Sequence, residues 1–443
     1  MEHPYVCSKD DHPEGAEVDA LHVYARELMR EPDRRWPNLL LLLGDQIYVD
    51  EGSPEARRFI RSRRDVSQPP GEEVVDFEEY TRLYHESWRE PSVRWLLSTV
   101  STAMIIDDHD IGDDWNISRS WKEEMDRKPW WRRRVQAGFM TYWIYQHLGN
   151  LSPELLAENE TYRGVRDARE DAAPVLREYA RRAYEDREGI RWSYHRDLGG
   201  TRVIVMDSRG GRVLEKGRRS IFDEQERSWI WAQAEGEFDH LLIATSDPIL
   251  LSHGLHHLEA FSESVCDGAW GRAAAWIGER LRRAEDFDHW ASFGRSFREI
   301  AGLLRQIASP NRHRPPASVV MLSGDVHHAY LAEVGFPPGT HAESRVYQAV
   351  CSPYRNPLDD RERLAIRILF RPETAALTRG LARAAGVRDP EIGWRFLEGP
   401  YFDNQVATLT LEGRSARIEL EKTTAAEGSD ERALQTSFER RLA

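Results

Sequence analysis

Acidic residues and histidines in this sequence stand directly after short runs of apolar residues. Five segments have this form: LLLLLGD (39–45), AMIIDDHD (103–110), VIVMDSR (203–209), LLIATSDP (241–248) and VVMLSGDVHH (319–328). If the runs form neighbouring parallel strands, at least five carboxylates and two or three imidazoles converge on one sheet edge. Crowded carboxylates raise one another's pKa or require a counter-ion, and mixed Asp/His sets suit divalent or trivalent metal ions. The pattern therefore predicts a metal site, and the excess of ligands favours two ions.

The spacing within the last segment supports a shared centre. In extended chain, residues i and i+2 face the same side, so Asp325 and His327 can bind one ion. His328 then points away, which favours a structural role for it. A single Asp after a strand is usually a turn former or a helix N-cap. Because the pattern recurs at five strand ends, we favour the metal site for the set as a whole.

The elements that must position these residues follow from the hydrophobic pattern. Each apolar run has four or five consecutive apolar residues without alternation, which is typical of strands covered on both faces. The spacing of Leu21, Tyr24 and Leu28 predicts a helix over about 17–31, and Asp223 before EQERSWIWAQ suits a helix N-cap. Strands that alternate with helices predict a layered α/β fold.

Two other regions have a different character. The stretch 117–190 is rich in Arg and Trp and has helical patterns without a buried-strand run, so we predict a helical insertion or a lid. QVATLTLEG and SARIELE predict a hairpin around Gly413. The polar tail, about 423–443, is predicted to be frayed.

Composition limits the classes of protein. The 443 residues include 40% apolar and 31% charged residues, which is ordinary for a globular protein. The net charge of −14 argues against a protein that coats nucleic acid. No apolar run approaches the ~18 to 20 residues of a membrane span, and the N-terminus lacks the pattern of a signal peptide. Three dispersed cysteines make no disulfide framework, so we expect a cytoplasmic protein with reduced thiols and no membrane partner.

The same strand ends resemble the alkaline phosphatase D (PhoD-like) family of the metallophosphoesterase superfamily. The matching motifs are GDQIYVDE (44–51), DDHDIGDDW (107–115), MDSRGGR (206–212), GLHHLEA (254–260), SGDVHHAY (323–330), YWIYQHLGNLSPE (142–154), CSPYRNPL (351–358) and GPYFDNQVATLTLEG (399–413). The resemblance implies a single domain over 1–443, folded as a four-layer αββα sandwich. It also implies a metal-dependent phosphomonoesterase or phosphodiesterase that acts on a small phosphoester.

The resemblance assigns roles to individual residues. Asp45 looks like the carboxylate that bridges two metals, Tyr48 like a ligand of iron(III), and Asp108 like a further ligand. His109 would donate a proton to the leaving oxygen, while Asp325 and His327 match the last ligand motif. Fe(III) and Ca(II) are the metals that the family implies, with Zn or Mn as alternatives.

The N-terminus departs from the family pattern. Members usually have a full first strand that ends in an iron-ligating cysteine, often after a separate β-domain and an export signal. Here only MEHPYV precedes Cys7, which otherwise stands in the expected order for that ligand. Asp247 also departs, because it falls where many superfamily members have a His ligand.

Several residues suit two roles equally well. Arg209 and Arg212 could hold a phosphate or form a salt bridge within their loop, and Arg355 is similar. In the loop expected after 241–244, His256 and His257 could line the pocket or be structural. Asn116 could be a site residue or a helix cap.

The predicted mechanism is in-line attack on phosphorus by a metal-bound hydroxide, with His109 protonating the leaving oxygen and Asp108 and Arg209 supporting the reaction. A diesterase or nucleotide pyrophosphatase with the same site is the enzyme alternative. A non-catalytic metal-binding protein is the alternative from another class. The sequence leaves open the substrate, the metals and the oligomeric state.

Overall fold

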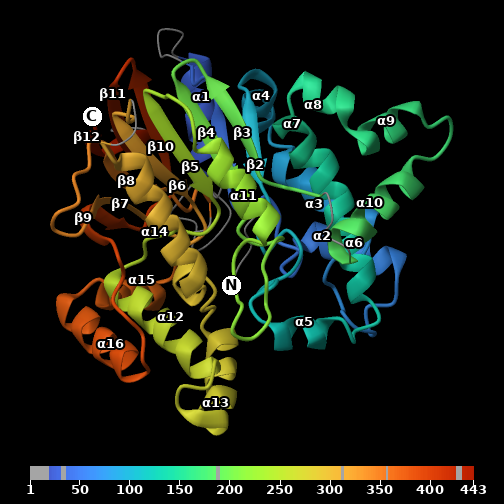
Figure 1. Ribbon diagram of the computed structural model, residues 1–443. Helices are drawn as coiled ribbons and strands as arrows, with labels where there is room; N and C mark the ends of the chain where they lie inside the picture. The colour runs from blue at the N-terminus through green and yellow to red at the C-terminus, as the bar shows by residue number, and fades with distance from the viewer. Residues whose placement is uncertain (1–18, 31–35, 186–189, 311–313, 356–357, 426–431) are drawn as a thin grey trace.

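A seven-stranded sheet forms the centre of the molecule (Figure 1). The computed structural model describes residues 19–30, 36–185, 190–310, 314–355, 358–425 and 432–443. The strand order is β3-β4-β5-β6-β8-β7-β9, with β4, β5, β6 and β8 parallel and the others antiparallel to their neighbours. The strands are β3 (Tyr194–Leu198), β4 (Thr201–Met206), β5 (His240–Thr245), β6 (Ser318–Ser323), β7 (Ala329–Gly335), β8 (Arg345–Val350) and β9 (Gly393–Tyr401).

Two smaller sheets form a second layer. Strand β1 (Leu40–Leu43) pairs in parallel with β2 (Thr102–Ile105). Strands β10 (Gln405–Glu412), β11 (Ser415–Ala425) and β12 (Arg432–Arg441) form an antiparallel sheet. Residues of β2, β4, β5, β8 and β11 share one buried cluster, so the second layer packs face to face on the central sheet.

The two faces of the central strands explain the uninterrupted apolar runs. In β5, Leu242 and Ala244 face the second layer, whereas Leu241 and Ile243 face the helices α11 (Glu224–Gln233) and α14 (Gly294–Ala308). Both faces are therefore buried, as the sequence predicts. Helices α1 (Ala20–Arg30) and α4 (Pro91–Thr99) cover the outer face of β1 and β2. The layers run helix, sheet, sheet, helix, which confirms the predicted αββα sandwich.

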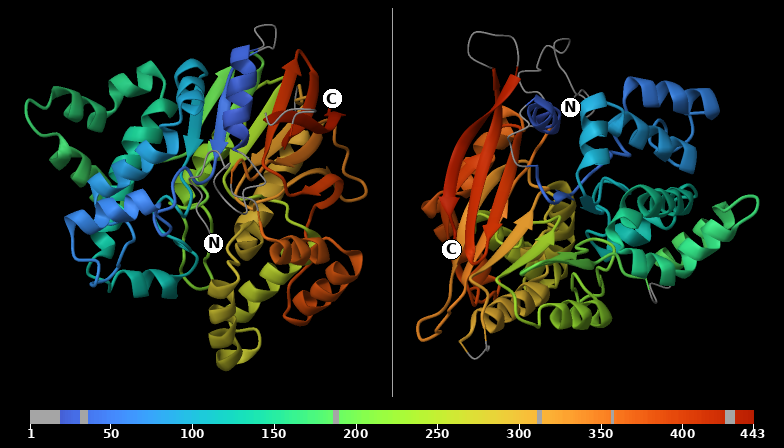
Figure 2. Two further views of the ribbon diagram at one scale, coloured as in Figure 1. Left: turned by 180° about the vertical axis from the view of Figure 1, so that it is seen from behind. Right: turned by 90° about the horizontal axis from the view of Figure 1, so that it is seen from above.

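The remaining helices surround these layers. Those within 117–190 are α5 (Arg119–Met125), α6 (Trp131–Tyr142), the π-helical turn η1 (Trp143–His147), α7 (Leu148–Asn150), α8 (Pro153–Glu158), α9 (Glu160–Asp167) and α10 (Ala173–Glu185). They lie to one side of the sheets, beside α2 (Pro54–Arg63) and α3 (Phe77–Trp88) (Figure 2). Figure 1 shows α12 (His253–Cys266), α13 (Gly271–Ala284), α15 (Asp360–Leu369) and α16 (Pro372–Ala384) grouped below the central sheet, with the 3₁₀ turn η2 (Trp290–Ser292) preceding α14.

The C-terminal tail differs from its prediction. The hairpin at Gly413 is present, with Glu412 opposite Ser415. Of the segment 423–443 that was predicted to be frayed, residues 423–425 end β11 and Arg432–Arg441 form β12, while 426–431 lie outside the described residues. Leu442 beyond β12 is fully buried. Strand β12 lies at the edge of its sheet, and only one of its faces packs on the protein. Its other face can be polar, so the composition of the segment gave no sign of a strand.

In the part of the chain that the structure describes, no helix is long and apolar enough to cross a membrane. The cytoplasmic location stays a prediction.

The five motif-bearing strands lie in two layers rather than in one sheet. Strands β1 and β2 belong to the second layer, and β4, β5 and β6 to the central sheet. The two layers approach each other closely at Gly324 after β6, because a Cβ atom there would lie 2.3 Å from the carbonyl oxygen of Leu43. The ends of both sheets are thereby held against each other.

We expect Gly324→Ala to destabilise the protein by about 2 to 3 kcal/mol, since an overpacked side chain must displace a strand. Gly380→Ala in helix α16 is the matched control, because nothing lies within 4 Å of its added Cβ. The control should be stabilised by about 0.5 to 1 kcal/mol. Urea unfolding of both variants measures the difference, and equal midpoints would contradict the close approach of the two layers.

Candidate metal and active site

Four carboxylates meet where the two layers join. Ligand oxygens of Asp45, Asp107, Asp108 and Asp325 all lie within 4.8 Å of one another. A second group of the same kind consists of Asp45, Asp108 and His109. The structure thus brings together Asp45, Asp108 and Asp325, as predicted for metal ligands, and adds Asp107. The two groups share Asp45 and Asp108.

The electrostatics of this cluster call for a cation. Burial, reinforced by neighbouring carboxylates, raises the pKa of Asp45 and of Asp107 well above the ordinary value of Asp. Buried oxygens of Asp45, Asp107 and Asp108 make no hydrogen bond to any described group. Unsatisfied buried carboxylate oxygens are costly, and hard divalent cations prefer such ligands. The residues present therefore fit metal ions.

His109 lies over the ring of Tyr48, with 4.6 Å between the ring centroids. Asp50 and Asp113 flank it, with ring nitrogens 3.9 Å and 3.8 Å from their carboxylate oxygens. Burial disfavours the imidazolium, but Asp108 and Asp45 raise the pKa of His109 well above its usual value. The raised pKa favours the protonated ring, which is the form that can act as an acid.

The segment from Asp325 to His327 is a tight turn, not the extended chain on which its prediction rested. Both residues have positive φ, 67° and 51°, and each of the N–H groups of Val326 and His327 donates to a carbonyl two residues earlier. The alternation argument for these two side chains is therefore wrong. Non-glycine residues in this region are strained and persist where the surroundings hold them, often at functional sites.

His328 packs among the rings of Tyr330, Phe370 and Phe402. Burial lowers its pKa to about 4. This confirms its predicted structural role.

Arg209 forms ion pairs within the cluster. Its Nε donates to Asp107 at 2.6 Å, its Nη2 lies 2.9 Å from Asp247, and it also pairs with Asp288. Burial disfavours its charge, but the surrounding carboxylates raise its pKa. The structure thus shows Arg209 in ion pairs that link several loops, and its binding of phosphate stays a prediction.

Arg212 completes the same network. It donates to Asp247 at 2.9 Å and to Asp288 at 3.0 Å. Asp247 is therefore bound by two guanidinium groups, which explains why an acid is tolerated there. Its own pKa is about 7, raised by burial and moderated by both arginines.

Three site residues were missed by the sequence analysis. Asp288 and His289 enter from the segment after α13, and Glu259 enters from α12. The His289 ring has its Nδ1 2.6 Å from Glu259 and its Nε2 3.4 Å from Asp325. No strand pattern marks the segment that carries Asp288 and His289. The GLHHLEA motif pointed to its two histidines, whereas its glutamate, Glu259, is the residue that reaches the site. Burial disfavours the charge on His289, but Glu259 raises its pKa well above normal.

The histidines of that motif lie elsewhere, in helix α12 rather than in a loop. His256 packs on Phe297 and Trp394, with ring centroids 4.7 Å and 4.9 Å apart. His257 lines a separate hollow of about 470 Å³ with Arg379 and Asp389. The interpretation of the two histidines as lining this site is therefore wrong, because the helix turns them toward other surroundings.

Two other predicted residues have supporting positions, and one lies outside the structure. The side-chain amide of Asn116 donates to the Arg209 carbonyl at 3.1 Å, so it holds that loop; Ser118, not Asn116, caps α5. Arg355 donates to Ser87 at 2.9 Å and pairs with Asp19 at 3.7 Å. Cys7 lies outside the described residues.

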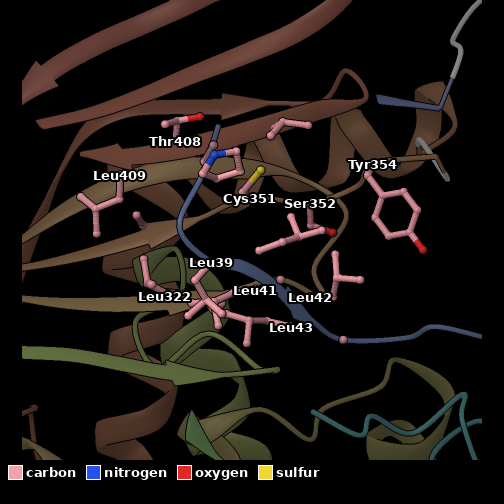
Figure 3. A pocket seen from close by; sticks show the side chains of 18 of the residues that line it. Leu39, Leu41, Leu42, Leu43, Leu322, Cys351, Ser352, Tyr354, Thr408 and Leu409 are labelled. Atoms are coloured by element: carbon pink, nitrogen blue, oxygen red, sulfur yellow. The ribbon is translucent and has the colours of Figure 1, made fainter. Parts of the chain in front are cut away.

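A cavity of about 750 Å³ extends from the site between β1 and β10. Asp45, Tyr48, Asp325 and His327 are among the residues that line it. The remainder is largely apolar, and Figure 3 shows Leu41, Leu43, Leu322 and Leu409 directed into this space. The site thus combines a charged end with an apolar wall.

The sequence matches the family model for PhoD-like phosphatases over residues 19–353. Among solved structures, one described as "Structure of PhoD" aligns with a TM-score of 0.55 at 12% identity, covering 99% of this chain and 70% of that chain. A purple acid phosphatase from yellow lupin (Lupinus luteus) seeds aligns with a TM-score of 0.40 at 9% identity, over 92% and 48% of the two chains. No curated protein sequence matches the chain.

The core position of His256 makes stability depend on pH. Burial lowers its pKa to about 3, so the folded state keeps this imidazole neutral. The stability that the protein gains from this neutral His256 is fully present above ~6.5, the pKa of His in the unfolded chain. It is lost as the pH falls toward the lower pKa of His256 in the folded state. Between pH 7 and pH 5, His256 should account for about 2 kcal/mol of lost stability.

His256→Gln should reduce that loss, whereas His85→Gln on the exposed face of α3 should not. Urea unfolding at both pH values measures it. Identical pH dependence in wild type and His256→Gln would contradict the assignment.

Proposed function

The chain belongs to the PhoD-like phosphatase family and is a metal-dependent phosphoric ester hydrolase, and we propose that two cations at the carboxylate cluster serve its catalysis. The observation that carries the proposal is the set of four carboxylates, Asp45, Asp107, Asp108 and Asp325, whose ligand oxygens lie within 4.8 Å of one another. One carboxylate of such a set can serve two ions, as in two-metal sites. Bound cations would supply an activated water and would neutralise charge on the phosphoryl oxygens.

The ligand set that we propose contains Asp45 as the bridge, with Asp107, Asp108 and Asp325. Tyr48, His327 and Cys7 are proposed as further ligands on the family resemblance. Iron(III) and calcium are the proposed ions, with zinc or manganese as alternatives, because oxygen-rich sets with phenolate and imidazole accept all of these.

His109 is the proposed proton donor to the leaving oxygen. Asp108 and Asp45 raise its pKa well above the usual value of His, against the effect of burial, which favours the protonated form that an acid needs. Tyr48 supports one face of the ring, and Asp50 and Asp113 flank its nitrogens. Arg209 acts as a positioning residue, since its ion pairs fix Asp107 and neutralise part of the cluster.

The proposed substrate is a small phosphoester whose apolar part rests in the cavity between β1 and β10. The net charge of −14 favours such a substrate over nucleic acid. A diesterase or nucleotide pyrophosphatase remains the second candidate, since the cavity has room for a second ester group. Turnover of nitrophenyl phosphate and of its bis-ester distinguishes the two, and a non-catalytic role would leave both unhydrolysed.

Asp108→Ala should lower turnover of nitrophenyl phosphate by about 100-fold to 1000-fold, because it removes a carboxylate from the proposed cation site. The metal content by elemental analysis should fall in the same preparation. Asp360→Ala, at an exposed position in α15, is the control and should keep both. An Asp108→Ala protein with full metal content and full activity would rule out the proposed site.

His109→Gln separates proton donation from metal binding. A proton donor matters most for a basic leaving group, so hydrolysis of glycerol phosphate should fall by about 100-fold to 10,000-fold. Hydrolysis of nitrophenyl phosphate, whose leaving group needs little protonation, should fall much less. If both substrates slow equally and metal is lost, His109 is a ligand instead of the acid.

A further inference from the structure

The Glu259–His289 pair enters the site from outside the strand ends. Glu259 lies on α12 and is completely buried, and His289 precedes η2. Neither residue belongs to the two compact ligand groups. His289 joins them through Asp325, which is a member of the larger group.

Glu259 fixes the orientation of the His289 ring through the ring nitrogen that faces away from Asp325. Nδ1 lies 2.6 Å from Oε1 of Glu259, which is the geometry of a hydrogen bond donated by the ring to a carboxylate. Metal binding requires the ring to lose its Nε2 proton, which leaves the lone pair on that atom. Nε2 lies 3.4 Å from Oδ2 of Asp325, so a cation that took the place of this proton would meet two ligand atoms.

The separation of these two atoms is that of neighbouring ligands on one ion. Metal–nitrogen and metal–oxygen bonds of about 2.0 to 2.2 Å place adjacent tetrahedral ligands about 3.3 to 3.5 Å apart. Metal-ligating histidines commonly donate their other N–H to a carboxylate, which sets the tautomer and the ring orientation. The Glu259–His289–Asp325 series has this arrangement.

We propose that His289 is a metal ligand through Nε2, oriented by Glu259, and that it shares an ion with Asp325. This inference rests on the proposed function for the existence of the cation site. It gives the carboxylate-rich side of the centre a nitrogen ligand, which favours first-row transition metals there over calcium or magnesium.

Binding of Co²⁺ to the metal-free protein tests the assignment without any use of activity. Its visible absorption reports the ligand set, and a titration gives the affinity. His289→Gln should weaken binding of one equivalent by at least about 100-fold and alter the spectrum, and Glu259→Gln should weaken it by about 10-fold to 100-fold. His253→Gln is the control, because its ring stacks on Trp394 at 4.7 Å, away from the cluster.

His289→Glu separates a ligand from a partner in an ion pair. A carboxylate at this position restores a ligand atom, so Co²⁺ binding should recover in part relative to His289→Gln. If His289 served only as a counter-ion for Asp325, the added negative charge would further destabilise the metal-free protein, and the Co²⁺ spectra of all variants would match the wild type. That result would overturn the proposal.

Failures of the two proposals can be told apart. If wild type binds Co²⁺ and hydrolyses phosphoesters while both His289→Gln and Glu259→Gln bind Co²⁺ equally tightly, only the assignment of His289 fails. If binding depends on His289 but no phosphoester is hydrolysed, only the proposed catalysis fails. A wild-type protein that takes up no Co²⁺ overturns both.

Discussion

Negative charge buried at the junction of two sheets is the constraint to which the rest of this structure responds. Asp45, Asp107, Asp108 and Asp325 place their oxygens within 4.8 Å of one another. Such a set is unstable unless protons, cations or both compensate it. Within the described chain, the compensation comes chiefly from Arg209, with Arg212 and the imidazoles of His109 and His289 beside it. The unsatisfied oxygens that remain are the reason to expect metal ions.

The fold supplies the junction, and the loops supply the compensation. Parallel strands from both layers end at the same place, and Gly324 lets their backbones approach. Arg209 then links the segment after β4 to the segments after β2 and β5 and to the segment after α13. The four clustered carboxylates and Arg209 all follow strands directly, whereas Glu259 comes from α12 and Asp288 and His289 come from the segment after α13, so the site needs both kinds of segment.

This division explains what the sequence could reveal. The buried strands and Asp45, Asp108 and Asp325 were predictable, because apolar runs without alternation mark strands and their ends mark the site. Asp288, His289 and Glu259 were not predictable. They come from a loop and a helix, and no hydrophobic pattern in those segments indicates that they reach the site. The residue types at Asp325–His327 predict extended chain instead of the observed turn, because positive φ in non-glycine residues leaves no trace in the sequence. The frayed-tail prediction failed because a single apolar face is hard to recognise in a polar edge strand.

The contacts of Arg209 have a consequence for the assembly of the protein. Its partners Asp107 and Asp288 are 102 and 79 residues away along the chain. Contacts of such long range form late, after the entropy of closing large loops has been overcome. The cation site therefore exists only in the completed fold, and cations select the native state over every partly folded one. A cation at 100 times its dissociation constant adds about 2.7 kcal/mol to the native state, so the supply of metal in the surroundings becomes part of the folding equilibrium of this chain.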